Sequence, residues 1–102
     1  MLRFHKEIVK EFEPIGKKAK IILFGSVASG TYRFDSDIDL AIISDDKKIK
    51  QHAEKIADKV LVKYGKVVSL KFISPKSMNT KDPFIKEILK GKVVYDGSKR
   101  SD

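Results

Sequence analysis

The sequence predicts a single mixed α/β (α+β) domain, in which a small twisted sheet of mixed strand direction has helices packed mainly on one face. Apolar residues recur at helical spacing in some segments and form short strand-like runs in others. Glycine, proline and aspartate stand where these segments begin and end. The 102 residues, 41% of them hydrophobic, suffice for one modest core. We expect the domain to cover residues 1–97 and residues 98–102 to form a disordered tail.

The N-terminal part is predicted to form one helix and two strands. Residues 2–13 form an amphipathic helix that ends at Pro14 and Gly16. The apolar positions of this helix recur at helical spacing: Phe4, Ile8, Val9 and Phe12. The first strand covers about residues 19–24 and the second about residues 37–43. A glycine–serine turn and a short helix are expected between the two strands.

The central part is predicted to form a long helix and a third strand. Asp45 or Asp46 can cap the helix, which runs to Tyr64 and stops at Gly65. The inner face of the helix consists of residues at helical spacing: Ile49, Ala53, Ile56, Val60 and Tyr64. The third strand covers residues 66–73. One side of this strand is apolar: Val68, Leu70 and Phe72.

The C-terminal part is predicted to form a short helix and an edge strand. Residues 74–81 form a polar loop, after which Asp82 caps a helix with Pro83 at its first position. Four residues of this helix are expected to face inward: Phe84, Ile85, Ile88 and Leu89. Gly91 ends the helix, and residues 93–95 form the fourth strand.

The composition indicates an intracellular protein, with a cytoplasmic location expected and no membrane as partner. The chain has no cysteine, which excludes disulfides and thiol metal sites. It also lacks an apolar stretch long enough to span a bilayer. Charged residues near the N-terminus exclude the apolar region of a signal peptide: Lys6, Glu7, Lys10 and Glu11.

The chain is basic, with a formal net charge of +8 and a pI of about 9.7. Residues 52–102 contribute +6 of this charge, and 19 of the 22 cationic residues are lysines spread widely along the chain. Such a surface is typical of thermophilic proteins, and it also fits binding to a nucleic acid or an acidic protein. Both interpretations stay open at this point, with nucleic acid a possible but not the favoured partner.

Two aspartates at alternate positions open the second strand. Alternating strand faces put Asp37 and Asp39 on one face, with Ile38 and Leu40 on the other. Neighbouring carboxylates repel each other, so a cation would stabilise the pair. Mg²⁺ or Mn²⁺ suits such oxygen ligands together with substrate phosphates. A solvated acidic turn is the alternative, whereas a calcium loop is excluded because Leu40 stands where that loop needs glycine.

A glycine–serine turn follows the first strand. Gly25 permits close backbone approach to a ligand and unusual dihedral angles. Ser26 offers a hydroxyl and can cap the short helix that follows, whose free N–H groups would face an anion. Gly30 gives a second flexible point. The segment therefore indicates a phosphate-binding turn, and an ordinary turn is the alternative.

Together, the turn and the aspartates resemble the signature of the nucleotidyltransferase superfamily with the polymerase-beta-like fold. The pattern G-S-x3-G-x5-S-D-x-D-L is met by Gly25, Ser26, Gly30, Ser36, Asp37, Asp39 and Leu40. The order of helices and strands around it agrees as well, so the resemblance covers nearly the whole chain. It is greatest to the minimal nucleotidyltransferases, the MNT proteins that prokaryotes encode beside HEPN-domain proteins.

The resemblance implies a function and roles for the residues that match the signature. Gly25 and Ser26, with Ser36, would hold the triphosphate of ATP or another nucleoside triphosphate. Asp37 and Asp39 would be the catalytic residues and would bind Mg²⁺ or Mn²⁺. The partner would be a HEPN-type toxin, with this chain as the antitoxin that transfers a nucleoside monophosphate to a hydroxyl group of the toxin. An oligomer is also possible.

One departure from the family pattern concerns a third carboxylate, which catalytically complete relatives place on a later strand. In this chain the position falls at or near Ser69, and the strand over residues 66–73 contains no acid. Such an acid would help bind a second metal and deprotonate the attacking hydroxyl. Lys71 on the same face could contact phosphates, pair with the aspartates in place of a metal, or simply be solvated.

The departure leaves two other classes of function open. The first is a non-catalytic module that keeps the fold and neutralises its partner by contact. The second, less favoured, is an RNA-binding domain that relies on the basic surface. The segment Tyr32–Phe34 could dock a partner or close the domain's own core.

Overall fold

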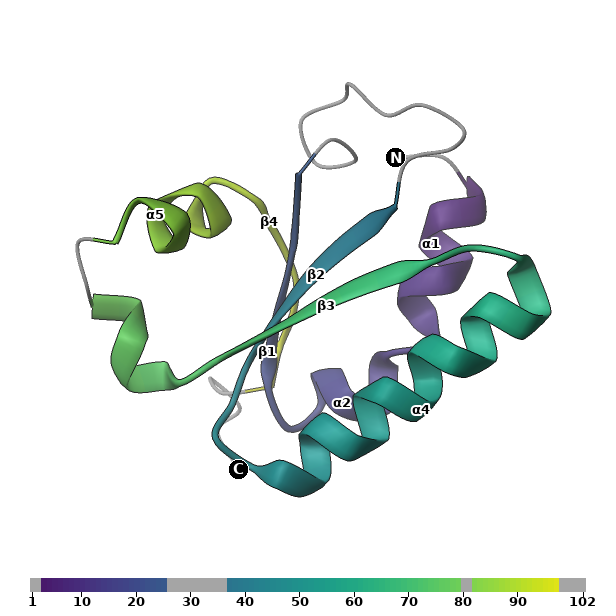
Figure 1. Cartoon of the computed structure of the whole chain (residues 1–102), viewed down its shortest axis with the longest axis horizontal. Helices are drawn as coiled ribbons and strands as arrows, with labels where there is room; N and C mark the ends of the chain where they lie inside the picture. Colours follow the sequence, from purple (N-terminus) through teal and green to yellow (C-terminus); the bar gives the residue numbers. More distant parts are fainter. Residues whose placement is uncertain (1–2, 26–36, 80–81, 98–102) are drawn as a thin grey trace.

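The computed structural model describes residues 3–25, 37–79 and 82–97. Four strands form one twisted sheet in the order β3-β2-β1-β4 (Figure 1). Their bounds are β1 Lys20–Phe24, β2 Ile38–Ile43, β3 Val68–Ile73 and β4 Lys92–Asp96. β1 is antiparallel to both β2 and β4, whereas β2 and β3 are parallel. The prediction of a mixed sheet with the fourth strand at its edge is therefore confirmed.

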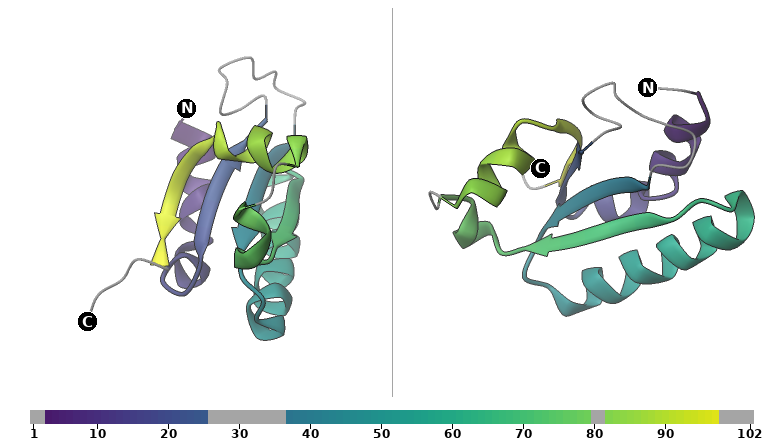
Figure 2. Two further views of the ribbon diagram at one scale, coloured as in Figure 1. Left: turned by 90° about the vertical axis from the view of Figure 1, so that its left-hand side faces the viewer. Right: turned by 45° about the horizontal axis from the view of Figure 1, so that its top comes forward.

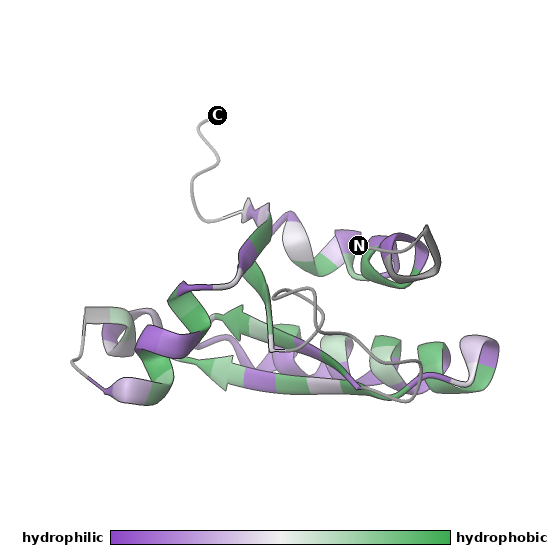
Figure 3. Ribbon diagram, turned by 90° about the horizontal axis from the view of Figure 1, so that it is seen from above, coloured by the Kyte–Doolittle hydropathy of each residue, from purple (hydrophilic) through white to green (hydrophobic). Residues whose placement is uncertain are grey.

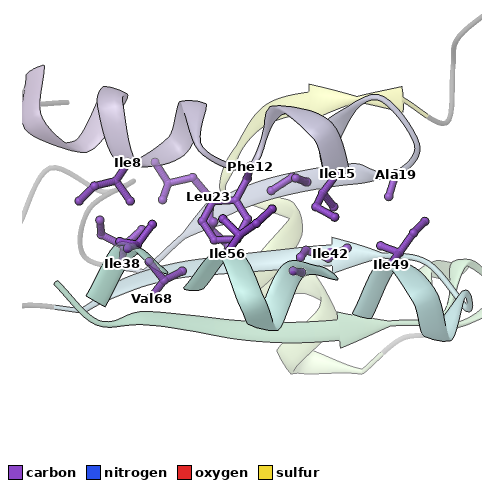
Figure 4. Packing of buried hydrophobic residues seen from close by; sticks show 14 residues of the cluster. Ile8, Phe12, Ile15, Ala19, Leu23, Ile38, Ile42, Ile49, Ile56 and Val68 are labelled. Carbon is purple, nitrogen blue, oxygen red and sulfur yellow. The ribbon is translucent and has the colours of Figure 1, made fainter. Parts of the chain in front are cut away.

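Three helices cover one face of the sheet and bury the main core. They are α1 (Arg3–Lys10), α2 (Glu13–Gly16) and α4 (Lys47–Tyr64). Figure 4 shows side chains from these helices meeting the inner sides of β1 and β2. The fully buried members of this cluster include Ile8, Phe12, Ile15, Ile21, Leu23, Ile38, Leu40, Ile42 and Val60. Burial of this apolar surface holds the helices against the strands.

A smaller core lies on the opposite face, under α5 (Pro83–Leu89) and the 3-10 helix η1 (Pro75–Asn79). Figure 2 shows α5 on the side of the sheet away from α4. The buried cluster on this face consists of Ile22, Phe24, Ala41, Ile43, Ile73, Ile85 and Ile88. Helices are thus packed mainly, but not only, on one face. The predicted polar loop after β3 contains η1.

The expectation that four residues of α5 face inward is only half right. Ile85 and Ile88 are buried, whereas Phe84 is 46% exposed and Leu89 is 50% exposed. A helix of only two turns can bury one narrow stripe of side chains against the sheet. The two isoleucines, at spacing i, i+3, form that stripe. Phe84 instead meets Phe24 edge to face, with ring centroids 6.3 Å apart.

The N-terminal helix is interrupted earlier than predicted. α1 ends at Lys10, and a second helix begins at Glu13 with Pro14 in its first turn. Proline lacks an amide hydrogen, which a first-turn residue does not need for helix hydrogen bonding. Pro14 therefore opens α2 instead of terminating the helix before it.

The long helix α4 begins and ends as the sequence predicts. Asp46 is its N-cap, and the side chain accepts a hydrogen bond of 2.8 Å from the amide of Lys48. Gly65 closes it in the left-handed conformation at φ 66°. The predicted inner face is buried at Ile49, Ala53, Ile56 and Val60, with Tyr64 half-buried. Within the described parts of the chain, every helix is too short or too polar to serve as a membrane span.

Candidate active site

The end of β1 and the start of β2 lie at the same end of the sheet (Figure 1). The two strands are antiparallel neighbours, and the last pair in their register joins Phe24 to Asp39. Gly25 follows β1 directly and Asp37 precedes β2 directly. The hairpin therefore brings the predicted phosphate turn and the predicted carboxylates together.

The predicted alternation of faces along β2 is observed. Ile38 and Leu40 are fully buried in the main core, whereas Asp39 is half-buried on the other face. Asp37 is exposed beside it. Because side chains of directly opposed residues share a face of the sheet, Asp39 lies on the same face as Phe24. The site thus faces the α5 side of the sheet.

Gly25 lies against the carboxylate of Asp39. Its φ of 79° is in the left-handed region, which side chains rarely adopt. A β-carbon added at this position would collide with Oδ2 of Asp39 and would lie 3.2 Å from the Cγ of that residue. Both the backbone conformation and the close approach therefore require glycine. Gly25, directly after β1, therefore lies in close contact with the Asp39 carboxylate on β2.

The electrostatics of Asp39 favour a cation. Burial raises the pKa of the Asp39 carboxyl, the negative charge of Asp37 raises it further, and the positive charge of Lys71 partly opposes both. Holding two such carboxylates close together is unfavourable unless a positive charge compensates them. Mg²⁺ commonly binds one or two protein carboxylates together with the phosphates of a substrate. The residues present therefore fit one divalent cation shared with a phosphorylated ligand.

The third strand places Ser69, the position where complete relatives are expected to carry a further acid, beside Asp39. β3 is parallel to β2, and the register pairs Asp39 with Ser69 and Ala41 with Lys71. Ser69 is half-buried and Lys71 is exposed. Within the described ranges no group of three or more histidine, cysteine, aspartate or glutamate side chains could hold a metal ion. The site therefore combines two carboxylates with a hydroxyl and an ammonium group.

Several residues of the predicted site lie outside the described residues. They are Ser26, Gly30, Tyr32, Arg33, Phe34 and Ser36, together with the tail at 98–102 and the short helix expected after Gly25. Among described residues, the sequence interpretation assigned Phe84 to the core and did not place it beside the site. Its ring contacts Phe24, the cross-strand neighbour of Asp39. Only the packing of α5 reveals this, because the spacing of Phe84 also fits an inward position.

The match to a known sequence family places the chain in the nucleotidyltransferase class. The sequence model of the nucleotidyltransferase domain matches residues 2–96, and the chain belongs to that family. The assignment confirms the predicted resemblance to the nucleotidyltransferase superfamily.

Two curated relatives come from Methanocaldococcus jannaschii. "Putative protein adenylyltransferase MJ0604" is 37% identical over 83 residues, which cover 78% of this chain and 81% of the relative. "Putative protein adenylyltransferase MJ1379" is 32% identical over 98 residues, which cover 93% of this chain and 90% of the relative. Both relatives thus match over most of their length.

A solved structure shares the fold. It is described as "Crystal structure of the toxin-antitoxin with AMP-PNP" and aligns with a TM-score of 0.62 at 24% identity. The alignment covers 93% of this chain and 74% of that chain. This likeness supports the nucleotidyltransferase fold for the described sheet and helices.

Proposed function

We propose that this chain is a metal-dependent nucleotidyltransferase that transfers a nucleoside monophosphate from ATP to a hydroxyl group on a partner protein. The observation that carries the proposal is the contact between Gly25 and the Asp39 carboxylate, beside Asp37. A phosphate-binding turn fitted directly against paired carboxylates can hold a metal–triphosphate complex. Neither half of the arrangement alone would have this use.

Each residue has a role in the proposal. Asp37 and Asp39 hold Mg²⁺ or Mn²⁺. The missing side chain of Gly25 lets the backbone lie against the Asp39 carboxylate, next to the triphosphate. Ser26 and Ser36, which lie outside the described residues, complete the phosphate contacts in the family pattern. The cation, when bound, neutralises charge on the phosphates. The chain itself contributes positioning and electrostatic complementarity, which supply most of the rate in phosphoryl and nucleotidyl transfer.

The transfer step balances as follows. The hydroxyl oxygen of the acceptor forms a bond to the α-phosphorus of ATP, and the bond from that phosphorus to the bridging oxygen of the β-phosphate breaks. The proton of the hydroxyl passes to solvent water, and pyrophosphate leaves with the bonding electron pair. The product is an adenylylated acceptor.

The acceptor is proposed to be a HEPN-type toxin, for which this chain is the antitoxin of a HEPN/MNT pair. Support comes from the names of the curated relatives, each a "Putative protein adenylyltransferase", and from the toxin–antitoxin structure in which one chain shares the fold. The AMP-PNP in that assembly supports an adenine nucleotide as the donor. The family resemblance supplies the HEPN identity.

A second candidate function is favoured by one observation. Ser69 stands directly opposite Asp39, where a third acid would complete a two-metal site. A chain without that acid could bind its partner and a nucleotide without transferring anything. In this alternative, neutralisation of the partner would depend on contact alone.

The test combines the purified chain with the HEPN protein encoded nearest to its gene. Mg²⁺ and ATP labelled on the α-phosphate are added, and the partner is analysed for label and for the mass of one adenylyl group. The Asp37→Asn/Asp39→Asn double variant is the matched control, with ATP labelled on the γ-phosphate as a second control. Label transferred from the α-position by the wild type only is the expected result.

Two outcomes would overturn the proposal in different ways. If wild type and the double variant bind Mg-ATP equally well in calorimetry, the site assignment is wrong. If only the wild type binds Mg-ATP but no label reaches the partner, the chain is the non-catalytic module.

A further inference from the structure

We propose that Lys71 supplies the second positive charge of the nucleotide site, so that the chain binds its nucleotide with one divalent cation. The ammonium group would contact phosphate oxygens on the β3 side of Asp39. This inference rests on the proposed function, since it assumes that a nucleotide occupies the site. It adds a phosphate-binding residue that lies outside the glycine–serine and Asp-x-Asp signature.

The register of the parallel strands places Lys71 at the site. Ser69 is opposite Asp39, and Lys71 is two residues further along the same strand, opposite Ala41. Residues two apart on a strand share one face, so Ser69 and Lys71 are on the face that carries Asp39. Diagonal neighbours on adjacent strands are within reach of long side chains. The lysine stem is long enough to bring its charge next to the carboxylates.

The other residues of β3 do not compete for this role. Val68, Leu70 and Phe72 pack on the α4 side of β3, against the main core. Figure 3 shows hydrophobic and hydrophilic residues alternating along this part of the sheet. The opposite face of β3 carries Ser69, Lys71 and, at the end of the strand, Ile73, which is buried in the smaller core. Lys71 is exposed and therefore free to turn toward a ligand.

The charge on this side of the site decides which ligands it accepts. An acid in place of Ser69 would add a negative charge and attract a second divalent cation. Ser69 and Lys71 instead carry one positive charge between them, on the ammonium group, and this charge repels a second cation. The same ammonium attracts the phosphates of a nucleotide, and lysine is a common phosphate-binding residue that acts as a point charge. The arrangement thus favours a single metal with a lysine beside it.

The number of bound metal ions tests this inference directly. Mn²⁺ is titrated into the chain in the presence of a nucleotide with a methylene group between its α- and β-phosphorus atoms, and free Mn²⁺ is measured by electron paramagnetic resonance. We expect one Mn²⁺ per chain for the wild type. The Ser69→Asp/Lys71→Met double variant should bind two, because both substitutions change the local charge in the same direction.

Nucleotide affinity gives the second readout. Lys71→Met should weaken binding of the same Mn²⁺–nucleotide complex by roughly tenfold or more, as expected for loss of a charged hydrogen bond. Lys55→Met is the matched control, because Lys55 is an exposed lysine on α4, which packs on the opposite face of the sheet. It removes the same charge from the chain and should leave affinity unchanged. Thermal melting of each variant verifies that it is folded.

Specific outcomes overturn the inference. Two Mn²⁺ ions per wild-type chain, or equal nucleotide affinity in Lys71→Met and Lys55→Met, would show that Lys71 is only a solvated lysine. Tighter Mn²⁺ binding with unchanged or tighter nucleotide binding in Lys71→Met would show that Lys71 pairs with the aspartates and opposes the metal. If the wild type binds no Mn²⁺–nucleotide complex at all, the proposed function is wrong, and the inference about Lys71 is wrong with it. If the wild type binds the complex but Lys71→Met binds it equally well, only the inference about Lys71 is wrong.

Discussion

Substitution of Gly25 by alanine should damage the site far more than it damages the fold. The backbone there has φ 79°, and an L-residue in this left-handed region costs about 1–2 kcal/mol. The added β-carbon also collides with Oδ2 of Asp39. To restore an ordinary contact, that carboxylate must move by roughly 1 Å, and a misplacement of this size can lower a rate about a hundredfold.

Gly65→Ala provides a matched control for this variant. Gly65 also has a positive φ, of 66°, but a β-carbon added there meets nothing within 4 Å. Both variants should therefore lose about 1–2 kcal/mol of unfolding free energy, and each 1 kcal/mol corresponds to about 4–8 °C in Tm for a domain of this size. Only Gly25→Ala should also bind the Mg-nucleotide complex more weakly.

The assays are thermal unfolding and calorimetric titration with Mg²⁺ and the methylene nucleotide analogue. We expect Gly65→Ala to bind like the wild type and Gly25→Ala to bind at least tenfold more weakly, with adenylyl transfer reduced about a hundredfold. Equal binding by the two variants would refute the argument that the contact between Gly25 and Asp39 sets the geometry of the site.

Three further predictions concern stability. The pKa of the Asp39 carboxyl is raised above 3.8 in the folded protein, so the folded state releases this proton at a higher pH than the unfolded chain. The charged carboxylate therefore lowers the free energy of unfolding as the pH rises through and above that value. Asp39→Asn should therefore melt at a higher temperature than wild type at pH 7, with the difference vanishing near pH ~3, and a lower melting temperature at pH 7 would contradict this. Asp46→Ala removes the N-cap of α4 and should cost about 1 kcal/mol in urea unfolding, whereas the exposed neighbour in Asp45→Ala should change almost nothing; equal losses would disprove the capping role. Phe12 has no exposed surface, so Phe12→Ala should cost about 3–5 kcal/mol, and a loss under about 1 kcal/mol would show that the main core does not depend on this ring.

The sequence predicted the elements with strong local signals and erred where the outcome depends on a neighbour. Asp46 and Gly65 bound α4 as expected, because each acts on backbone groups within a few residues of itself. Pro14 was wrongly expected to end the first helix. The error arose because the missing amide hydrogen of proline, which ends one helix, also suits the first turn of the next. Phe84 was wrongly placed inside, because spacing alone does not tell which stripe of a short helix meets the sheet.

The chemistry of the site was also partly accessible from sequence. Alternation along β2 correctly put Asp39 on one face of the strand and the buried Ile38 and Leu40 on the other, because the period of side chains is a local property of a strand. The identity of the family followed from residue types and their spacing, and the family match over residues 2–96 confirms it. The roles of Ser26 and Ser36 stay predictions.

The sequence by itself thus determined where the four strands and the long helix lie, which strand faces are apolar, and which family the chain belongs to. Only the tertiary structure decided that Gly25 touches Asp39 and that Ser69 pairs with Asp39 across β2 and β3. The physical reason is that strand order and register depend on pairing between segments far apart in the chain. Local preferences fix the period of each strand, whereas burial on both faces of the sheet selects the register that brings these groups together.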